Sequence, residues 1–378
     1  MKKLCSADHP VWAMAFRPFY LLCALYGAFS VLLWGFGFTG TRAISGYLWH
    51  AHEMVWGYAG GIVVAFLLTA VATWTQQPPI RGKFLMWLVG LWLAARLTAF
   101  LPWGIPTGLL GTAFFWLGAY GMWQSVWASR NTRNYIAVAA IVLLGFSHLA
   151  FHYYAWAGET ETLRTGLSAG IVMVAGFIGL IGNRIIPFFT ARRLNTPQVQ
   201  TPMNAMLAAL VLPMAATALM MTHTAVGLAA WLILGAGCLG CVQSYRWFNR
   251  GILGEPMLWT LHLGYAASSL GMVVLAVSFA APSLQSLGVH LLAVGGIGLL
   301  TVSMMVRTAL GHTARPLRYG HRVLADGGRH CRARIGRRHG LCQCHGIHPQ
   351  HPPVRLLVRR IAAAVFLALP PMADATAP

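Results

Sequence analysis

The sequence predicts an all-α fold: a polytopic membrane bundle of about ten transmembrane helices with the N-terminus in the cytoplasm. Of its 378 residues, 57% are hydrophobic and only 9% are charged, whereas soluble domains carry about 25% charged residues. Ten apolar runs are long enough to cross a hydrocarbon layer of about 30 Å, which takes roughly 20 helical residues. The 15 Trp and 41 Gly also fit this class, because Trp gathers at membrane interfaces and Gly is common in membrane helices.

The predicted spans follow one another with short links that carry turn-forming or helix-breaking residues, such as Gln77-Pro-Pro79 and Gly254-Glu-Pro256. The first apolar run has no small-residue cleavage site after it, so it is expected to be a retained helix rather than a signal peptide. In chain order, the spans are expected at 17–38, 51–74, 84–101, 107–127, 135–157, 166–189, 204–222, 226–245, 258–280 and 287–309.

The basic residues fix the orientation of these spans. With Lys2 and Lys3 in the cytoplasm, every inner loop carries at least one basic residue, whereas the outer loops hold only Arg42 and Arg164. The net charge of +20 therefore indicates topology control and contact with a lipid bilayer, and no nucleic-acid partner is expected.

The chain divides at about residue 317. Residues 1–317 form the predicted transmembrane domain, while residues 318–378 form a tail that holds ten of the 27 basic residues, all of them Arg within 318–360. The apolar run at 361–370 is too short to span a membrane. Two origins stay open for this tail: a basic segment lying on anionic lipid, or the product of a shifted reading frame.

The segment Trp49-His-Ala-His-Glu-Met54 stands where the second span begins, and it concentrates ionisable groups. Glu53 is the only acidic residue placed inside any predicted span. Ionisable residues within membranes are costly and commonly functional. The segment therefore predicts a metal or haem site involving His50 and His52.

Further histidines are expected at the same outer depth as this segment, namely His148, His152 and His290. His148 and His152 are four residues apart, so both lie on one helical face and can address one centre. His50 and His52 are two residues apart, or roughly 200° around a helix axis, so both face one metal only if the helix starts later or is irregular there. The alternative is that these are interfacial histidines without a ligand.

Glu53 has three candidate roles. It can relay protons, orient a ligating histidine from the second coordination shell, or pair with an arginine buried in the membrane. Arg96 is the better arginine for that pairing because it is expected at a similar depth, whereas Arg184 lies near the inner face.

Several ordered motifs give the chain a family resemblance. Together with Trp49–Met54 they are FRPFY at 16–20, FLLTAVATWT at 66–75, QPPIRG at 77–82, GNRIIPFFT at 182–190, LHLGY at 261–265 and LGHTARPL at 310–317. On these motifs, residues from about 8 to 317 resemble the NnrS family of haem- and copper-containing membrane proteins.

The resemblance implies a bacterial inner-membrane protein that takes part in the response to nitric oxide and in tolerance of nitrosative stress. Haem and copper are the implied cofactors and nitric oxide the implied ligand, while the electron donor is unknown. His262 and His312 also fall in matching motifs. The family usually has twelve membrane helices and the resemblance stops near residue 317, so the shifted-frame origin of the tail is favoured.

Two other functions stay open on the sequence. A nitric oxide or oxygen reductase would need a full set of ligands and a carboxylate proton path, for which one intramembrane Glu is thin support. A transporter without redox function would suit the number of helices, but its binding site is expected at the membrane midplane, and the polar residues gather toward the outer side.

Overall fold

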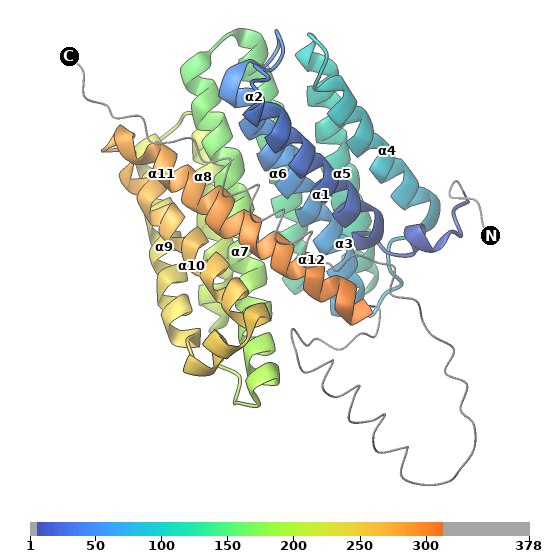
Figure 1. Ribbon diagram of the computed structural model, residues 1–378, viewed down its shortest axis with the longest axis vertical. Helices are drawn as coiled ribbons and strands as arrows, with labels where there is room; N and C mark the ends of the chain where they lie inside the picture. Colours follow the sequence, from blue (N-terminus) through green and yellow to red (C-terminus); the bar gives the residue numbers. More distant parts are fainter. Residues whose placement is uncertain (1–5, 313–378) are drawn as a thin grey trace, which may run out of the picture. The chain divides into compact units, whose positions relative to one another are not determined.

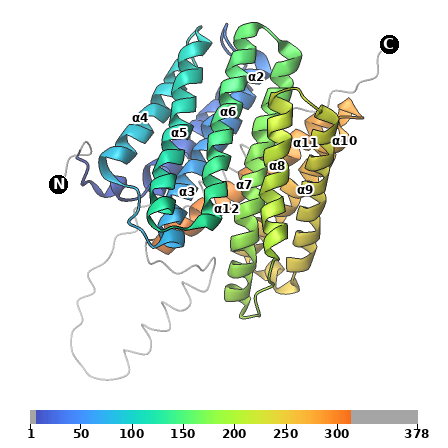
Figure 2. The same ribbon diagram turned by 180° about the vertical axis from the view of Figure 1, so that it is seen from behind.

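The computed structural model describes residues 6–312, and every regular element in that range is a helix (Figures 1 and 2). The predicted all-α membrane bundle is thus confirmed. The segment 318–378 lies outside the described residues, and its predicted separation from residues 1–317 stays a prediction.

The helices agree with the predicted spans to within six residues at either end, when the consecutive segments over 46–75 and over 285–312 are each counted as a single span. They are α1 (Phe16–Gly35), α2 (Gly46–His52), η2 (Glu53–Ala59), α3 (Gly60–Thr75), α4 (Gly82–Thr98), α5 (Gly104–Ala128), α6 (Tyr135–Ala157), α7 (Thr160–Leu194), α8 (Met203–Met221), α9 (Val226–Trp247), α10 (Pro256–Val277), α11 (Gln285–His290), η6 (Leu291–Gly298) and α12 (Leu299–His312). Short 3₁₀ turns are η1 (Pro10–Ala13), η3 (Thr132–Asn134), η4 (Arg250–Gly254) and η5 (Pro282–Leu284).

Eight helices of the described range are long and apolar enough to cross a membrane. Two of them are composite: α2, η2 and α3 join into one span over Gly46–Thr75, and the last span covers Pro282–Gly311. The predicted spans at α4 and α5 are not among the eight. Helix α4 has 17 residues, which gives a length of about 25 Å, and α5 includes Gly, Thr and Gln that lower its hydropathy.

Helix α7 lies between two groups of helices (Figures 1 and 2). It packs against α6 on the side of α1 to α6, and against α8 and α10 on the other side. Its 35 residues correspond to about 52 Å at 1.5 Å per residue. Helix α7 is therefore longer than the hydrocarbon core and is shared by both groups.

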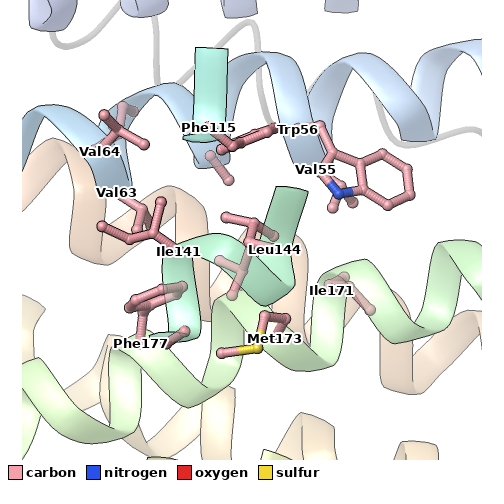
Figure 3. Close-up of a cluster of buried hydrophobic side chains, with 14 of the residues drawn as sticks. Val55, Trp56, Val63, Val64, Phe115, Ile141, Leu144, Ile171, Met173 and Phe177 are labelled. Atoms are coloured by element: carbon pink, nitrogen blue, oxygen red, sulfur yellow. The ribbon is translucent and has the colours of Figure 1, made fainter. Parts of the chain in front are cut away.

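The hydrophobic core is continuous where the first group meets α7. Figure 3 shows Trp56 of η2, Phe115 of α5, Leu144 of α6 and Ile171 of α7 converging in this core, and all four side chains are buried. Many large apolar side chains point outward instead, Trp87 and Trp231 among them. Such an outer surface is expected where the solvent is lipid rather than water.

Two π-helical segments interrupt the composite spans. Segment η2 begins directly after His52, and η6 begins directly after His290. Each π segment changes the rotation of the residues that follow it relative to an α-helix, and such segments are frequent at functional sites. Two of the predicted site histidines thus stand at the changes of helical register.

Candidate metal centre

Three predicted histidines converge on one point inside the first group of helices. His52 ends α2, while His148 and His152 come from α6. The Nε2 atom of His52 lies 3.1 Å from that of His148 and 3.0 Å from that of His152. One ligand atom from each residue lies within 4.8 Å of the others, and all three side chains are buried. We refer to His52, His148 and His152 as the three-histidine cluster.

Glycines of α5 make room for the two histidines of α6. A methyl group at Gly108 would stand 2.9 Å from His152 Cβ, and one at Gly111 would clash with the imidazole of His148. The close approach of α5 to α6 therefore depends on residues without a side chain at these two positions. Because the histidines are one helical turn apart, both imidazoles point to the same side of α6.

Glu53 sets the tautomer of His52. Its Oε1 lies 2.6 Å from His52 Nδ1, and a carboxylate accepts hydrogen bonds, so Nδ1 carries the proton and donates it. The Nε2 lone pair of His52 is therefore free to bind a ligand. On α6, the Nδ1 atom of His148 lies 3.1 Å from the hydroxyl oxygen of Thr112, and this hydrogen bond fixes the orientation of the ring but not its tautomer, because a hydroxyl can donate or accept.

The second carboxylate oxygen of Glu53, Oε2, accepts two hydrogen bonds. It accepts a hydrogen bond from Arg96 Nη1 at 2.7 Å and another from the Tyr26 hydroxyl. Both charged side chains are buried, with Glu53 at 0% and Arg96 at 4% exposure. Gly57, one turn after Glu53, leaves the space that the Arg96 guanidinium occupies. The carboxylate thus joins the cluster to a charge-neutralising ion pair inside the membrane.

Aromatic rings enclose the cluster. Phe151 stacks on His52 with ring centroids 5.3 Å apart, and Trp56 lies 5.3 Å from the same imidazole. Trp56 is held in place because its Nε1 donates to Ser147 Oγ at 3.1 Å. Phe115, seen beside Trp56 in Figure 3, packs against His148. This shell keeps bulk water from the Nε2 atoms.

The structure does not bring His50 or His290 into the cluster. The ring of His50 stacks on Trp34 at 5.4 Å, and its Nδ1 is buried without a hydrogen-bond partner among the described residues. His290 is exposed, and its Nδ1 donates to the Ser286 carbonyl at 2.7 Å. The separation of His50 from His52 has a simple cause: residues 50–52 are regular α-helix, and the register changes only after His52.

Other members of this site carry no signal in the sequence. Thr112 and Tyr26 are common residue types in membrane helices, and only their partners distinguish them. The spacing of Gly108 and Gly111 was the available hint, since small residues mark close helix contacts. Of the remaining motif histidines, His262 bonds Thr190 at 2.9 Å, away from the cluster, and the side chain of His312 lies outside the described part.

Comparison with known protein families gives a match to NnrS protein over residues 10–325. The chain belongs to the NnrS family. This membership places it among nitric-oxide-related membrane proteins. No match was found among curated proteins or among solved structures. The family match ends at residue 325, so most of the segment 318–378 lies beyond it.

Proposed function

We propose that this NnrS-family chain is an inner-membrane protein of the nitric oxide response that holds a single copper ion at the three-histidine cluster, near the periplasmic face. The convergence of three buried Nε2 atoms carries the proposal. Neutral imidazoles are suitable ligands for copper, iron and zinc. The positive-inside rule supports a position on the periplasmic side.

The donor set fits one small ion. Two nitrogens bound tetrahedrally at about 2.0 Å from one ion lie about 3.3 Å apart, close to the 3.0 and 3.1 Å between the Nε2 atoms of the cluster. The three imidazoles surround the common point, and Phe151 and Trp56 pack against them. A single ion fits this space, whereas a porphyrin ring does not.

When bound, copper would supply an open coordination position at which nitric oxide can bind. The protein contributes the surroundings of that position. Glu53 fixes the proton of His52 on Nδ1, and Thr112 orients His148. Arg96 neutralises the carboxylate, and the aromatic shell excludes water. The arrangement supports selective binding of a small uncharged molecule.

Haem, the second cofactor that the resemblance implies, needs ligands outside the cluster. His290 is a suitable donor because its Nδ1–H bonds a carbonyl and leaves Nε2 free. His50 adds a buried Nδ1 without a described partner. We assign these two residues as the haem candidates, and a Soret band that persists in both His50→Ala and His290→Ala would reject the assignment.

The copper assignment is tested by metal analysis of protein purified from copper-supplemented cells. His148→Ala should lose copper, because it removes one of three ligands. His223→Ala serves as the matched control, since His223 lies in the link after α8 and its ring packs on Tyr154 rather than on a histidine of the cluster. X-ray absorption should report nitrogen ligands at about 2.0 Å. A His148→Ala protein that keeps its copper and its absorption spectrum would contradict the proposal.

The hydrogen bonds around Glu53 favour a protein that binds nitric oxide over one that reduces it. A proton-delivering carboxylate must change its protonation during turnover, yet both oxygens of Glu53 are held by His52, Arg96 and Tyr26. Glu53 is thus better suited to positioning His52 than to carrying protons. Consumption of nitric oxide with a defined electron donor would restore the reductase alternative.

A further inference from the structure

A second polar cluster lies in the other half of the protein, between α7, α9 and α10. Its members are Asn183, Gln243, Trp247, Tyr265 and Ser269, and each is at most 5% exposed. None of them belongs to the three-histidine cluster. Buried polar groups within a membrane need internal partners because lipid offers none.

Three atoms of this second cluster have no hydrogen-bond partner among the described residues. They are the acceptors Asn183 Oδ1 and Gln243 Oε1 and the donor Trp247 Nε1. A buried polar group without a hydrogen-bond partner destabilises the fold. Ordered water is the common way in which proteins satisfy such atoms.

Tyr265 connects the members of the cluster. Asn183 Nδ2 donates to the Tyr265 hydroxyl at 3.1 Å, and the ring of Trp247 lies 4.9 Å from that of Tyr265. Tyr265 precedes Ser269 by one turn of α10. On α9, Gly240 packs against Ser269, and Gln243 stands between Gly240 and Trp247 on that helix. Asn183 and Trp247 therefore both lie against Tyr265, while Gln243 lies on the same face of α9 as Gly240 and Trp247.

A small cavity lies against two members of the cluster, Tyr265 and Ser269, in the middle of α10. It is lined by Tyr265, Ser268 and Ser269, among others, and offers about 10 Å³ to the centre of a water molecule. That volume is about what one water requires. The two serines and the tyrosine supply polar groups at its wall, so the cavity is suited to water rather than to an apolar ligand.

A larger cavity of about 290 Å³ lies at the end of the bundle where α7 and α9 stop. Thr190, Trp247 and Asn249 line it together with apolar residues of the link after α7. This end carries Arg192 and Arg193 and is the predicted cytoplasmic side. Trp247 lines this larger cavity and also packs on Tyr265, which lines the smaller one.

Water satisfies these groups better than a cation would. A cation can bind Asn183 Oδ1 and Gln243 Oε1 but cannot accept the proton of Trp247 Nε1. None of the cavity-lining residues is acidic, and an ion without a counter-charge is costly at this depth. Water both donates and accepts hydrogen bonds.

We propose that Asn183, Gln243 and Trp247, with Tyr265 and Ser269, form a hydrated pocket that admits water from the arginine-rich end of the bundle to the middle of the membrane. The pocket is separate from the three-histidine cluster and does not depend on metal binding there. It gives water a route into the protein from the predicted cytoplasmic side.

Radiolytic hydroxyl footprinting of the full-length protein tests this proposal, because radicals formed from bound water oxidise the side chains beside it. Trp247 and Tyr265 should be oxidised several-fold faster than Trp49 and Trp92. These two controls are equally buried, but their Nε1 atoms donate to the carbonyls of Ala99 and Gly57. Equal oxidation of Trp247, Trp49 and Trp92 would overturn the proposal.

The variant Gln243→Leu adds a second measurement. It replaces the unpartnered acceptor with an apolar group that cannot hold water, so oxidation of Tyr265 should fall while oxidation of Trp92 stays constant. Copper content and melting temperature report whether the variant folds. A high-resolution map supplies an independent result: density for water beside Gln243 and Ser269 is expected, and a dry, closed contact there would contradict the proposal.

Discussion

Glu53→Gln is the most informative single change, because it removes one charge while it nearly preserves shape. Glu53 is fully buried and Arg96 is 4% exposed. Removing one partner of a buried ion pair costs about 3–5 kcal/mol, since the other charge stays buried without compensation. The variant should therefore melt at a clearly lower temperature than the parent protein in the same detergent.

The same substitution should weaken copper binding through His52. The amide oxygen of Gln can still accept from His52 Nδ1, but it lacks the charge that makes this 2.6 Å contact strong. Loss of an outer partner of a ligating histidine typically lowers metal affinity about 10–100-fold. Competition titration with a copper chelator of known affinity measures this effect directly.

The double variant Glu53→Gln with Arg96→Leu separates the two effects. Deleting both charges removes the uncompensated guanidinium, so the melting temperature should recover. Copper affinity should remain low, because the carboxylate is still missing from His52. If the double variant regains parental copper affinity, or if Glu53→Gln alone never loses it, Glu53 acts on the fold and the proposed action on His52 is refuted.

Three further changes probe the same centre. Gly111→Ala should reduce copper content, because the added methyl group clashes with His148. Gly90→Ala is its control: a methyl group at Gly90 meets no heavy atom within 4 Å, so metal analysis should show unchanged copper content. Thr112→Val keeps the shape but removes the partner of His148 Nδ1, so chelator competition should show an affinity about tenfold lower. Removing copper by dialysis against a chelator should lower the melting temperature, since an ion at 100 times its Kd stabilises the fold by about 2.7 kcal/mol.

The sequence predicts the helices well because hydropathy and length decide membrane spans. Its expected span at 135–157 coincides with α6, and the other spans differ from the helices by a few residues at either end. In lipid, backbone N–H and C=O groups must bond within the segment, so a long apolar run forms a helix, and its length alone predicts a membrane span. The number of transmembrane helices is harder to predict where a helix is short, as α4 is.

Side-chain convergence is harder to predict than helix bounds. The sequence placed five outer histidines at one depth, yet only His52, His148 and His152 meet. Rotation of each helix about its axis decides which side chains face one another, and hydropathy does not specify it when apolar residues cover every face. The i, i+2 spacing of His50 and His52 indicates that a regular helix cannot turn both toward one point, without indicating which of them turns inward.

The charge balance of the cluster bears on which ion it suits. Glu53 accepts from His52, Arg96 and Tyr26, a set of donors that matches the ionised carboxylate, and Arg96 cancels that charge. With three neutral imidazoles, the surroundings of the Nε2 atoms carry no net charge.

A bound ion therefore brings its full charge into the low-dielectric interior, where charge is costly. A monovalent ion meets a smaller penalty than a divalent one, and copper is a metal with a stable monovalent state that accepts imidazole ligands. The same balance disfavours zinc, whose only ionic state is divalent, even though the spacing of the nitrogens suits both metals.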